Sequence, residues 1–191
     1  MVLSKFRDTV FNIIVYYVRL LGKIGFKPWH FTLLGFFFSI VYLHEVMCNS
    51  IALSILFLLA SGFMDVIDGA LAKALGVVSK SGAFLDSMID RLEDVVYYMG
   101  FIVLDFNRYI VSFALGLTIT LTYSSARLEN FGITNPRISL FERSDRITIL
   151  ALILASYMFS AEASKTLFNL YALALTIVVL LRMIIGYFDL K

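Results

Sequence analysis

Cysteine and histidine are nearly missing from this sequence, which has one cysteine and two histidines among 191 residues. The single Cys48 cannot form a disulfide within the chain, and so few soft ligands do not make a zinc site. Charged residues are also scarce, at 16%, and the formal net charge is only +2. So small a charge gives no basic surface for a nucleic-acid backbone, and we exclude nucleic-acid binding.

Apolar residues dominate the sequence instead. They make up 60% of the chain, which includes 18 phenylalanines and 10 tyrosines. Soluble domains contain about 45–50% apolar residues, and a helix needs about 20 of them to cross a bilayer. Six segments fit this length: 30–48, 50–75, 82–104, 108–131, 144–161 and 165–188. We therefore predict an all-α integral membrane protein of one domain, residues 1–191, in which 27–191 form a six-helix catalytic bundle.

The segment before the first span mixes charged and apolar residues. Lys5, Arg7, Arg19 and Lys23 alternate with phenylalanines, isoleucines and valines, and no small-residue cleavage site follows. This pattern favours an uncleaved amphipathic helix over residues 1–26 that lies on the membrane surface. An additional membrane span is the alternative, and the closely spaced charges argue against it.

Basic residues predict the orientation in the membrane, because short cytoplasmic loops carry an excess of Lys and Arg. Such residues precede the first span and lie between spans two and three and between spans four and five, whereas the opposite loops have only Arg108 and Lys165. The N-terminus and the loop after the second span should thus face the cytoplasm of a multi-pass cell-membrane protein.

The most informative feature is a set of four aspartates around that cytoplasmic loop: Asp65, Asp68, Asp86 and Asp90. A carboxylate at membrane depth costs roughly 2.5 kcal/mol or more, so four of them require a compensating ligand. Residues three or four apart share one face of a helix, so each helix should present a pair of aspartates. Two acidic faces are expected to meet. A solvated acidic loop is the simpler alternative, but the apolar run after Asp90 argues against it.

Carboxylate oxygens without a cluster of His or Cys favour Mg²⁺ or Mn²⁺, which bind carboxylates together with substrate phosphates. Four aspartates suffice for a two-metal centre, whose ions lie about 3.5–4 Å apart and stabilise the attacking and leaving oxygens of a displacement. Gly69 follows Asp68 directly and allows a phosphate to approach the backbone. The arrangement suits a substrate that contains a pyrophosphate.

The full pattern is Asp65-x2-Asp68-Gly69-x2-Ala72-Lys73-x8-Gly82-x3-Asp86-x3-Asp90. It resembles the signature of the CDP-alcohol phosphotransferase family. The resemblance implies that a hydroxyl attacks the lipid-linked phosphorus of a CDP-activated lipid and releases CMP. It also implies that Asp65, Asp68 and Asp86 hold metal, that Asp90 is both a ligand of the second metal and the base, and that the protein is a homodimer.

The resemblance further assigns the residues that bind the CDP-lipid donor: Trp29, Thr32, Asp65, Asp68, Gly69, Lys73 and Ser79. Gly69, Lys73 and Ser79 match positions near the nucleotide phosphates, and the segment from Pro28 to Thr32 resembles the Pro-Asn-x-x-Thr segment of the nucleotide pocket. Two positions depart from the family: Lys73 stands where Arg is usual, and Trp29 stands where Asn is usual. Lysine keeps a positive charge near the phosphate but loses the bidentate fork of arginine.

Arginines on the side of the aspartates point to the acceptor. They are Arg127, Arg137, Arg143, Arg146 and Arg182. Arginine binds phosphate through charge-assisted hydrogen bonds, so an acceptor with its own phosphate would use such a cluster. The E-R-x-x-R run at 142–146 and the segment 126–133 resemble the branch that uses inositol 1-phosphate and forms phosphatidylinositol phosphate or, in archaea, archaetidylinositol phosphate. For Arg137 and Arg143, topological anchoring at lipid headgroups is the alternative. The principal acceptor contacts predicted are therefore Arg127, Arg146 and Arg182, with Arg137 or Arg143 in support.

The sequence leaves other functions open. The same chemistry could use glycerol phosphate, serine or inositol as acceptor. A membrane prenyltransferase also uses aspartates and Mg²⁺, but its two motifs lie far apart and it needs more spans. A divalent-cation carrier could line its pathway with the aspartates, although these lie on one side of the membrane only.

Overall fold

A computed structural model describes residues 22, 24–77, 79–132 and 141–190, and these residues form six α-helices and no strand. The helices are α2 (Pro28–Met47), α3 (Ile51–Leu75), α4 (Lys80–Val103), α5 (Arg108–Asn130), α6 (Arg143–Tyr157) and α7 (Ala161–Asp189). The all-α class is confirmed, and each helix occupies a predicted segment. The fifth is shorter than predicted, because the chain turns after Tyr157 and Ser160 caps the next helix. The surface helix predicted for 1–26 falls almost wholly outside the described residues.

Helix ends follow from local sequence. The side chains of Ser79, Asn107 and Ser160 precede α4, α5 and α7 and accept hydrogen bonds from backbone N–H groups of the first turn, which otherwise lack partners. Pro28 opens α2, where its missing N–H costs nothing. Gly76 ends α3 with a φ of 65°, a left-handed conformation that glycine adopts without strain. These signals set the two ends of the loop between the aspartate pairs.

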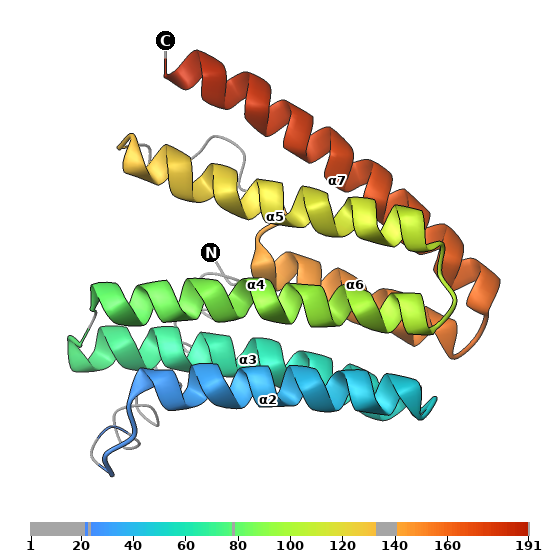
Figure 1. Cartoon of the computed structure of the whole chain (residues 1–191), viewed down its shortest axis with the longest axis horizontal. Coiled ribbons are helices and arrows are strands. Elements are labelled where there is room, and N and C mark those ends of the chain that lie inside the picture. The colour runs from blue at the N-terminus through green and yellow to red at the C-terminus, as the bar shows by residue number, and fades with distance from the viewer. Residues whose placement is uncertain (1–21, 23, 78, 133–140, 191) are drawn as a thin grey trace, which may run out of the picture.

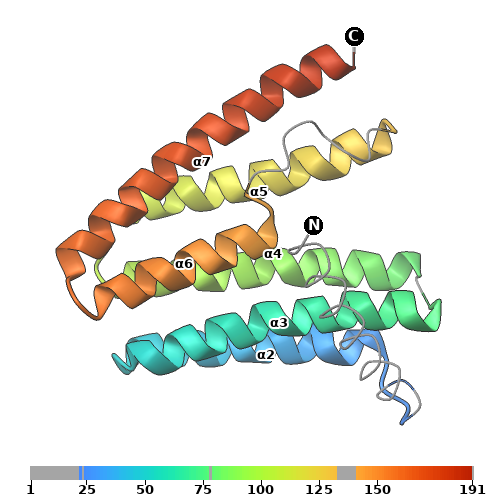
Figure 2. The same ribbon diagram turned by 180° about the vertical axis from the view of Figure 1, so that it is seen from behind.

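The helices form two groups. Helices α2, α3 and α4 run side by side in both views, and α2 contacts both of the others (Figures 1 and 2). Helices α5 and α7 pack on each other, and α7 leans away from the rest of the bundle toward its C-terminal end (Figure 1). Helix α6 connects the groups through contacts with α3 and α7, and α4 contacts α5. Charged residues of α4 and α6 contact one another where the two groups meet.

The core is aromatic. Phe101 and Phe168 are almost fully buried, with ring centroids 4.9 Å apart, and they join α4 to α7. The Tyr98 hydroxyl lies 2.7 Å from Thr118 Oγ1 and 2.8 Å from the Tyr171 hydroxyl, which connects α4 with α5 and α7. Buried hydroxyls that satisfy one another avoid the cost of an unpaired polar group. This packing fixes α4 relative to the C-terminal helices.

The exterior is rich in exposed Leu, Ile, Phe and Met side chains along the helices, as expected where lipid replaces water. Four of the described helices, α2, α3, α5 and α7, are long and apolar enough to cross a membrane. Helix α4 carries Asp86, Asp90, Glu93 and Asp94 among its first 15 residues, and α6 has only 15 residues. The multi-pass character therefore rests on four helices, and the count of six spans stays a prediction.

Candidate active site

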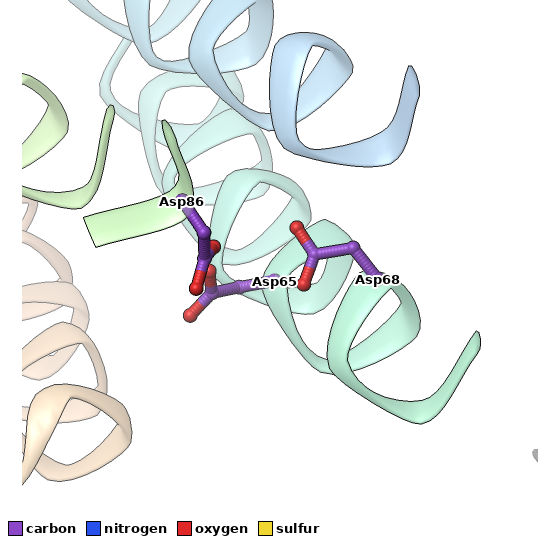
Figure 3. A group of neighbouring side chains, drawn as sticks. All are labelled: Asp65, Asp68 and Asp86. Atoms are coloured by element: carbon purple, nitrogen blue, oxygen red, sulfur yellow. The ribbon is translucent and has the colours of Figure 1, made fainter. Parts of the chain in front are cut away.

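The aspartates of α3 and α4 converge as the helical spacing predicts. Asp65, Asp68 and Asp86 each offer a carboxylate oxygen, and these oxygens lie within 4.8 Å of one another. Figure 3 shows the three side chains, two from α3 and one from α4, pointing toward a common space. Asp68 is buried and the other two are partly buried. Mutual repulsion of carboxylates this close is offset when a cation lies between them.

Two further observations fit a divalent cation at this cluster. Thr32 Oγ1 on α2 donates a hydrogen bond of 2.7 Å to Asp68 Oδ2, which orients that carboxylate. No described residue donates a hydrogen bond to the buried Oδ1 of Asp86. A buried, unsatisfied carboxylate oxygen beside two other carboxylates is the ligand set that Mg²⁺ and Mn²⁺ prefer. The residues present thus fit a divalent metal.

A first cavity of about 650 Å³ adjoins this cluster. Among its lining residues are Trp29, Thr32, Asp68, Gly69, Lys73, Ser79 and Asp86. The structure thus brings together every residue predicted to bind the donor except Asp65, which is not in the lining. At Gly69 the space that a Cβ atom would occupy is open, with no neighbouring atom within 4 Å, so the backbone is accessible from the cavity. Ser79 Oγ accepts a hydrogen bond of 3.0 Å from Gly82 N, so it is also the cap of α4.

Arg143, the first residue of α6, lies at the centre of the charged site. Its guanidinium forms ion pairs with Asp90 and Glu93, and its Nε lies 3.5 Å from Asp65 Oδ2. The Arg143 side chain is only 14% exposed. Asp90 is therefore not in the group of three aspartates that could share one ion. It pairs instead with Arg143, which also lies near Asp65.

Glu93 is held on its other side by a chain of polar contacts. The Tyr97 hydroxyl lies 3.2 Å from Glu93 Oε2 and 2.7 Å from Ser61 Oγ, and Ser61 donates a 2.7 Å hydrogen bond to the carbonyl of Gly35. Glu93, Tyr97 and Ser61 are buried. The network links α2, α3 and α4 behind the acidic cluster. It fixes the carboxylate that Arg143 contacts.

A second cavity of about 240 Å³ lies on the other side of Arg143, between α4, α5, α6 and α7. Asp90, Asp94, Ser125, Arg143, Arg146 and Arg182 are among its lining residues. Arg146 is buried and donates to Asp94 Oδ2 at 3.1 Å and to the Phe141 carbonyl at 3.0 Å. Arg182 donates to Ser125 Oγ. Three arginines thus converge beside Asp90.

The predicted arginines therefore divide. Arg143, Arg146 and Arg182 line the second cavity. Arg127, predicted as a principal acceptor contact, is exposed and packs on the Phe131 ring at 4.9 Å instead, because its position on α5 faces away from the bundle. Arg143, for which anchoring was the alternative, is enclosed by carboxylates. Arg137 lies outside the described residues.

Sequence reasoning missed Glu93 and Asp94 as site residues. A signal was present, because Asp86, Asp90 and Asp94 follow one another at intervals of four and Glu93 shares the face of Asp90. Ser125 had no such signal, since a serine inside an apolar helix is common. Phe141 also escaped attention. It has a φ of 58°, rare for an aromatic residue, and its carbonyl receives the hydrogen bond of Arg146.

The geometry defines what the site can do. An acidic cluster that fits a divalent cation faces a large cavity, and a carboxylate, Asp90, separates this cluster from a smaller cavity with three arginines. A phosphate-containing substrate bound to the cation and a second phosphate-bearing substrate among the arginines would meet at Asp90. The arrangement suits phosphoryl transfer between two bound substrates.

Comparison with known proteins agrees with this description. The sequence profile of the CDP-alcohol phosphatidyltransferase family matches residues 27–181. Archaetidylinositol phosphate synthase of Pyrococcus horikoshii is 34% identical over 149 residues, which cover 78% of this chain and 79% of the relative.

Two crystal structures of phosphatidylinositol phosphate synthase from Mycobacterium tuberculosis share the fold at 22% identity. The structure with CDP-DAG bound has a TM-score of 0.79 and covers 92% of this chain and 94% of its own. The complex with manganese and citrate has a TM-score of 0.77 and covers 91% and 88%, respectively. At this identity the likeness concerns the arrangement of helices.

Proposed function

This chain belongs to the CDP-alcohol phosphatidyltransferase family, and from this premise we propose that it transfers the lipid-phosphate moiety of a CDP-activated lipid to inositol 1-phosphate. The donor is CDP-archaeol or CDP-diacylglycerol, the products are CMP and archaetidylinositol phosphate or phosphatidylinositol phosphate, and the role is phospholipid biosynthesis. The similarity to an archaetidylinositol phosphate synthase supports this proposal, and so does the second cavity of this chain, which arginines line.

The first cavity is the proposed donor site. Its size and its mixture of carboxylates, Lys73 and apolar residues suit a lipid nucleotide whose pyrophosphate lies near Asp68 and Asp86. We propose that Asp65, Asp68 and Asp86 hold a divalent ion, Mg²⁺ or Mn²⁺. A second ion, with Asp90 among its ligands, is proposed from the family resemblance alone. Bound ions would neutralise charge on the pyrophosphate and polarise the phosphorus that is attacked. The complex of a similar fold with manganese is consistent with this choice.

Asp90 is the proposed general base. It lines the second cavity and lies one turn of α4 from Asp86, which lines the first, so it would be close to both substrates. Asp90 would accept the proton of the acceptor hydroxyl as the oxygen forms its bond to the lipid-linked phosphorus, and the bond from that phosphorus to the CMP oxygen breaks. Arg143 contacts the Asp90 carboxylate and keeps it oriented toward the junction.

The second cavity is the single observation that carries the choice of acceptor. It is small, it adjoins Asp90, and Arg143, Arg146 and Arg182 line it. A phosphate on the acceptor would pair with guanidinium groups there, while inositol or serine would leave them without that anion. We therefore favour inositol 1-phosphate over acceptors without a phosphate.

The decisive experiment measures CMP release by the purified protein with a CDP-lipid and Mg²⁺. Inositol 1-phosphate, inositol, glycerol phosphate and serine are tested in parallel, with CDP-archaeol and CDP-diacylglycerol as donors. We expect turnover with inositol 1-phosphate and little with free inositol. Preferred use of glycerol phosphate or serine would assign another acceptor, and absence of CMP release with all four would contradict the proposed transferase function.

We also propose the topology in the membrane. All six described helices would cross it, with the aspartates on the cytoplasmic side. Helix α6, of 15 residues and about 22 Å at 1.5 Å per residue, is shorter than a core of about 30 Å, so its first residue, Arg143, would lie below the membrane surface. Cys48, the single cysteine, is exposed in the turn between α2 and α3, at the opposite end of α2 from Thr32.

Labelling of Cys48 tests this topology directly. A membrane-impermeant maleimide should react with intact cells at Cys48 and fail to do so in a Cys48→Ser variant. A Cys48→Ser variant that carries Ser79→Cys should react only in opened membranes. The reverse pattern would contradict the cytoplasmic site. The homodimer implied by the family resemblance stays a prediction, and light scattering of the purified protein tests it.

A further inference from the structure

Trp29 is one of the residues that line the first cavity. It is the only tryptophan of the chain, 43% of its surface is exposed, and it lines the cavity together with Lys73 and Gly69. It also occupies a position where an asparagine would be usual. An indole cannot replace the paired hydrogen bonds of an amide. Besides its single Nε1–H donor, the indole offers a bound nucleotide the flat face of its ring.

The indole ring has a fixed backing on one face. The ring centroids of Trp29 and His30 lie 3.8 Å apart at an interplanar angle of 32°. The backbone N–H of Lys27 donates a 2.9 Å hydrogen bond to Nδ1 of His30, which holds the imidazole against the start of α2. Because His30 covers one face of Trp29, the indole loses little freedom when a second ring packs on it.

The distance from the acidic cluster also suits a base. Thr32 bonds to Asp68 at 2.7 Å and comes three residues after Trp29 on α2, which corresponds to a rise of about 4.5 Å. Trp29 therefore lies in the first turn of α2, about one helical turn beyond the carboxylates. A nucleotide with its phosphates at the aspartates would bridge this step with its ribose and bring its base to the indole.

We propose that Trp29 stacks on the nucleobase of the CDP-activated lipid and supplies affinity for the nucleotide without selecting the base. This inference rests on the proposed function, because the base belongs to the proposed donor. Stacking on an aromatic side chain tolerates every base, since each base has a π-face. Selection of cytosine would then have to come from other groups of the cavity, and Trp29 would strengthen cytidine and uridine nucleotides alike.

The test uses the purified full-length protein with Mg²⁺ and soluble nucleotides. Because Trp29 is the only indole, its fluorescence should be quenched in a saturable way by CMP and by UMP and left unchanged by ribose 5-phosphate. Calorimetry on Trp29→Ala should show CMP binding weakened by about tenfold, or about 1.4 kcal/mol. Trp29→Phe keeps a ring and should lose about threefold. Phe37→Ala removes an exposed aromatic of the same helix outside the cavity and should bind CMP normally.

The outcomes separate this inference from the proposed function. Normal CMP release with a CDP-lipid, together with unchanged CMP affinity in Trp29→Ala, would overturn the stacking role and make Trp29 a residue of the membrane interface. If Trp29→Ala bound CMP more weakly but bound UMP normally, Trp29 would select the base, which would contradict the proposal that it does not. Tenfold weaker CMP binding in Trp29→Ala by a protein that releases no CMP from a CDP-lipid would support stacking and contradict the proposed function.

Discussion

The two cavities hold their charges in different ways. In the first cavity the carboxylates of Asp68 and Asp86 face one another, and Lys73 is exposed. In the second cavity Arg146 is buried against Asp94, and Arg143 is enclosed by Asp90 and Glu93. We therefore expect the first cavity to need a cation before an anionic substrate can approach, whereas the arginines of the second cavity are held by carboxylates of the protein itself. Substitutions should reveal this difference.

Asp90→Asn should have the largest effect, because Asp90 is the proposed base, which lines the second cavity one helical turn from Asp86 of the first. A general base contributes about 10²- to 10⁴-fold to turnover, so kcat should fall by a factor of about 10² to 10⁴. Binding of the CDP-lipid should survive, since Asp65, Asp68 and Asp86 are intact. Single-turnover CMP release and equilibrium donor binding measure the two effects. Asp86→Ala is the matched variant and should lose both, and near-normal kcat in Asp90→Asn would refute the base assignment.

Asp94→Asn tests whether the ion pair between Asp94 and Arg146 stabilises the second cavity. Loss of one partner from a buried ion pair costs about 3–5 kcal/mol, so the variant should unfold more easily because Arg146 loses its counter-ion. Denaturant unfolding in detergent measures this. A double replacement of Asp94 and Arg146 by leucine should recover stability without activity. Asp105→Asn, at an exposed contact 3.8 Å from Lys165 Nζ, should leave stability unchanged, and an equal loss there would contradict the comparison.

Arg182→Ala tests recognition of the acceptor. Charge-assisted hydrogen bonds contribute about 1.5–3 kcal/mol, so the KM for inositol 1-phosphate should rise by about tenfold or more while the donor KM stays nearly constant. Arg127→Ala is the matched control, because Arg127 is exposed and outside the cavity. Steady-state kinetics with each substrate varied separate these cases. If Arg127→Ala raised the acceptor KM more than Arg182→Ala does, Arg127 would be a residue of the acceptor site.

Lys73→Ala should have the smallest effect. Exposed charge pairs contribute about 0.2–1 kcal/mol, so the donor KM should rise by no more than about fivefold, and Lys73→Arg should match or improve on the natural residue. Lys80→Ala, an exposed lysine at the start of α4 that does not line the cavity, is the control. If Lys73→Ala left the donor KM unchanged, Lys73 would play no part in binding the donor.

The sequence predicted that aspartates of two helices would converge, but it did not predict which arginines would share a cavity. Asp65, Asp68 and Asp86 lie on two consecutive helices joined by a short loop, so spacing along each helix was enough to bring their carboxylates together. The arginines come from α5, α6 and α7, and no local rule relates their directions. Arg127 was ranked above Arg143, yet the structure exposes the first and encloses the second.

By itself the sequence determined the helical class, the six helical segments, the paired aspartates and the family, because apolar length and helical periodicity are local properties. Tertiary structure decided which charged groups meet across the bundle. The packing of α6 against α3 and α7 brings Arg143 to Asp90 and Glu93, and Arg146 to Asp94. Such contacts depend on the rotation of each helix about its axis, which the packing of the whole core sets.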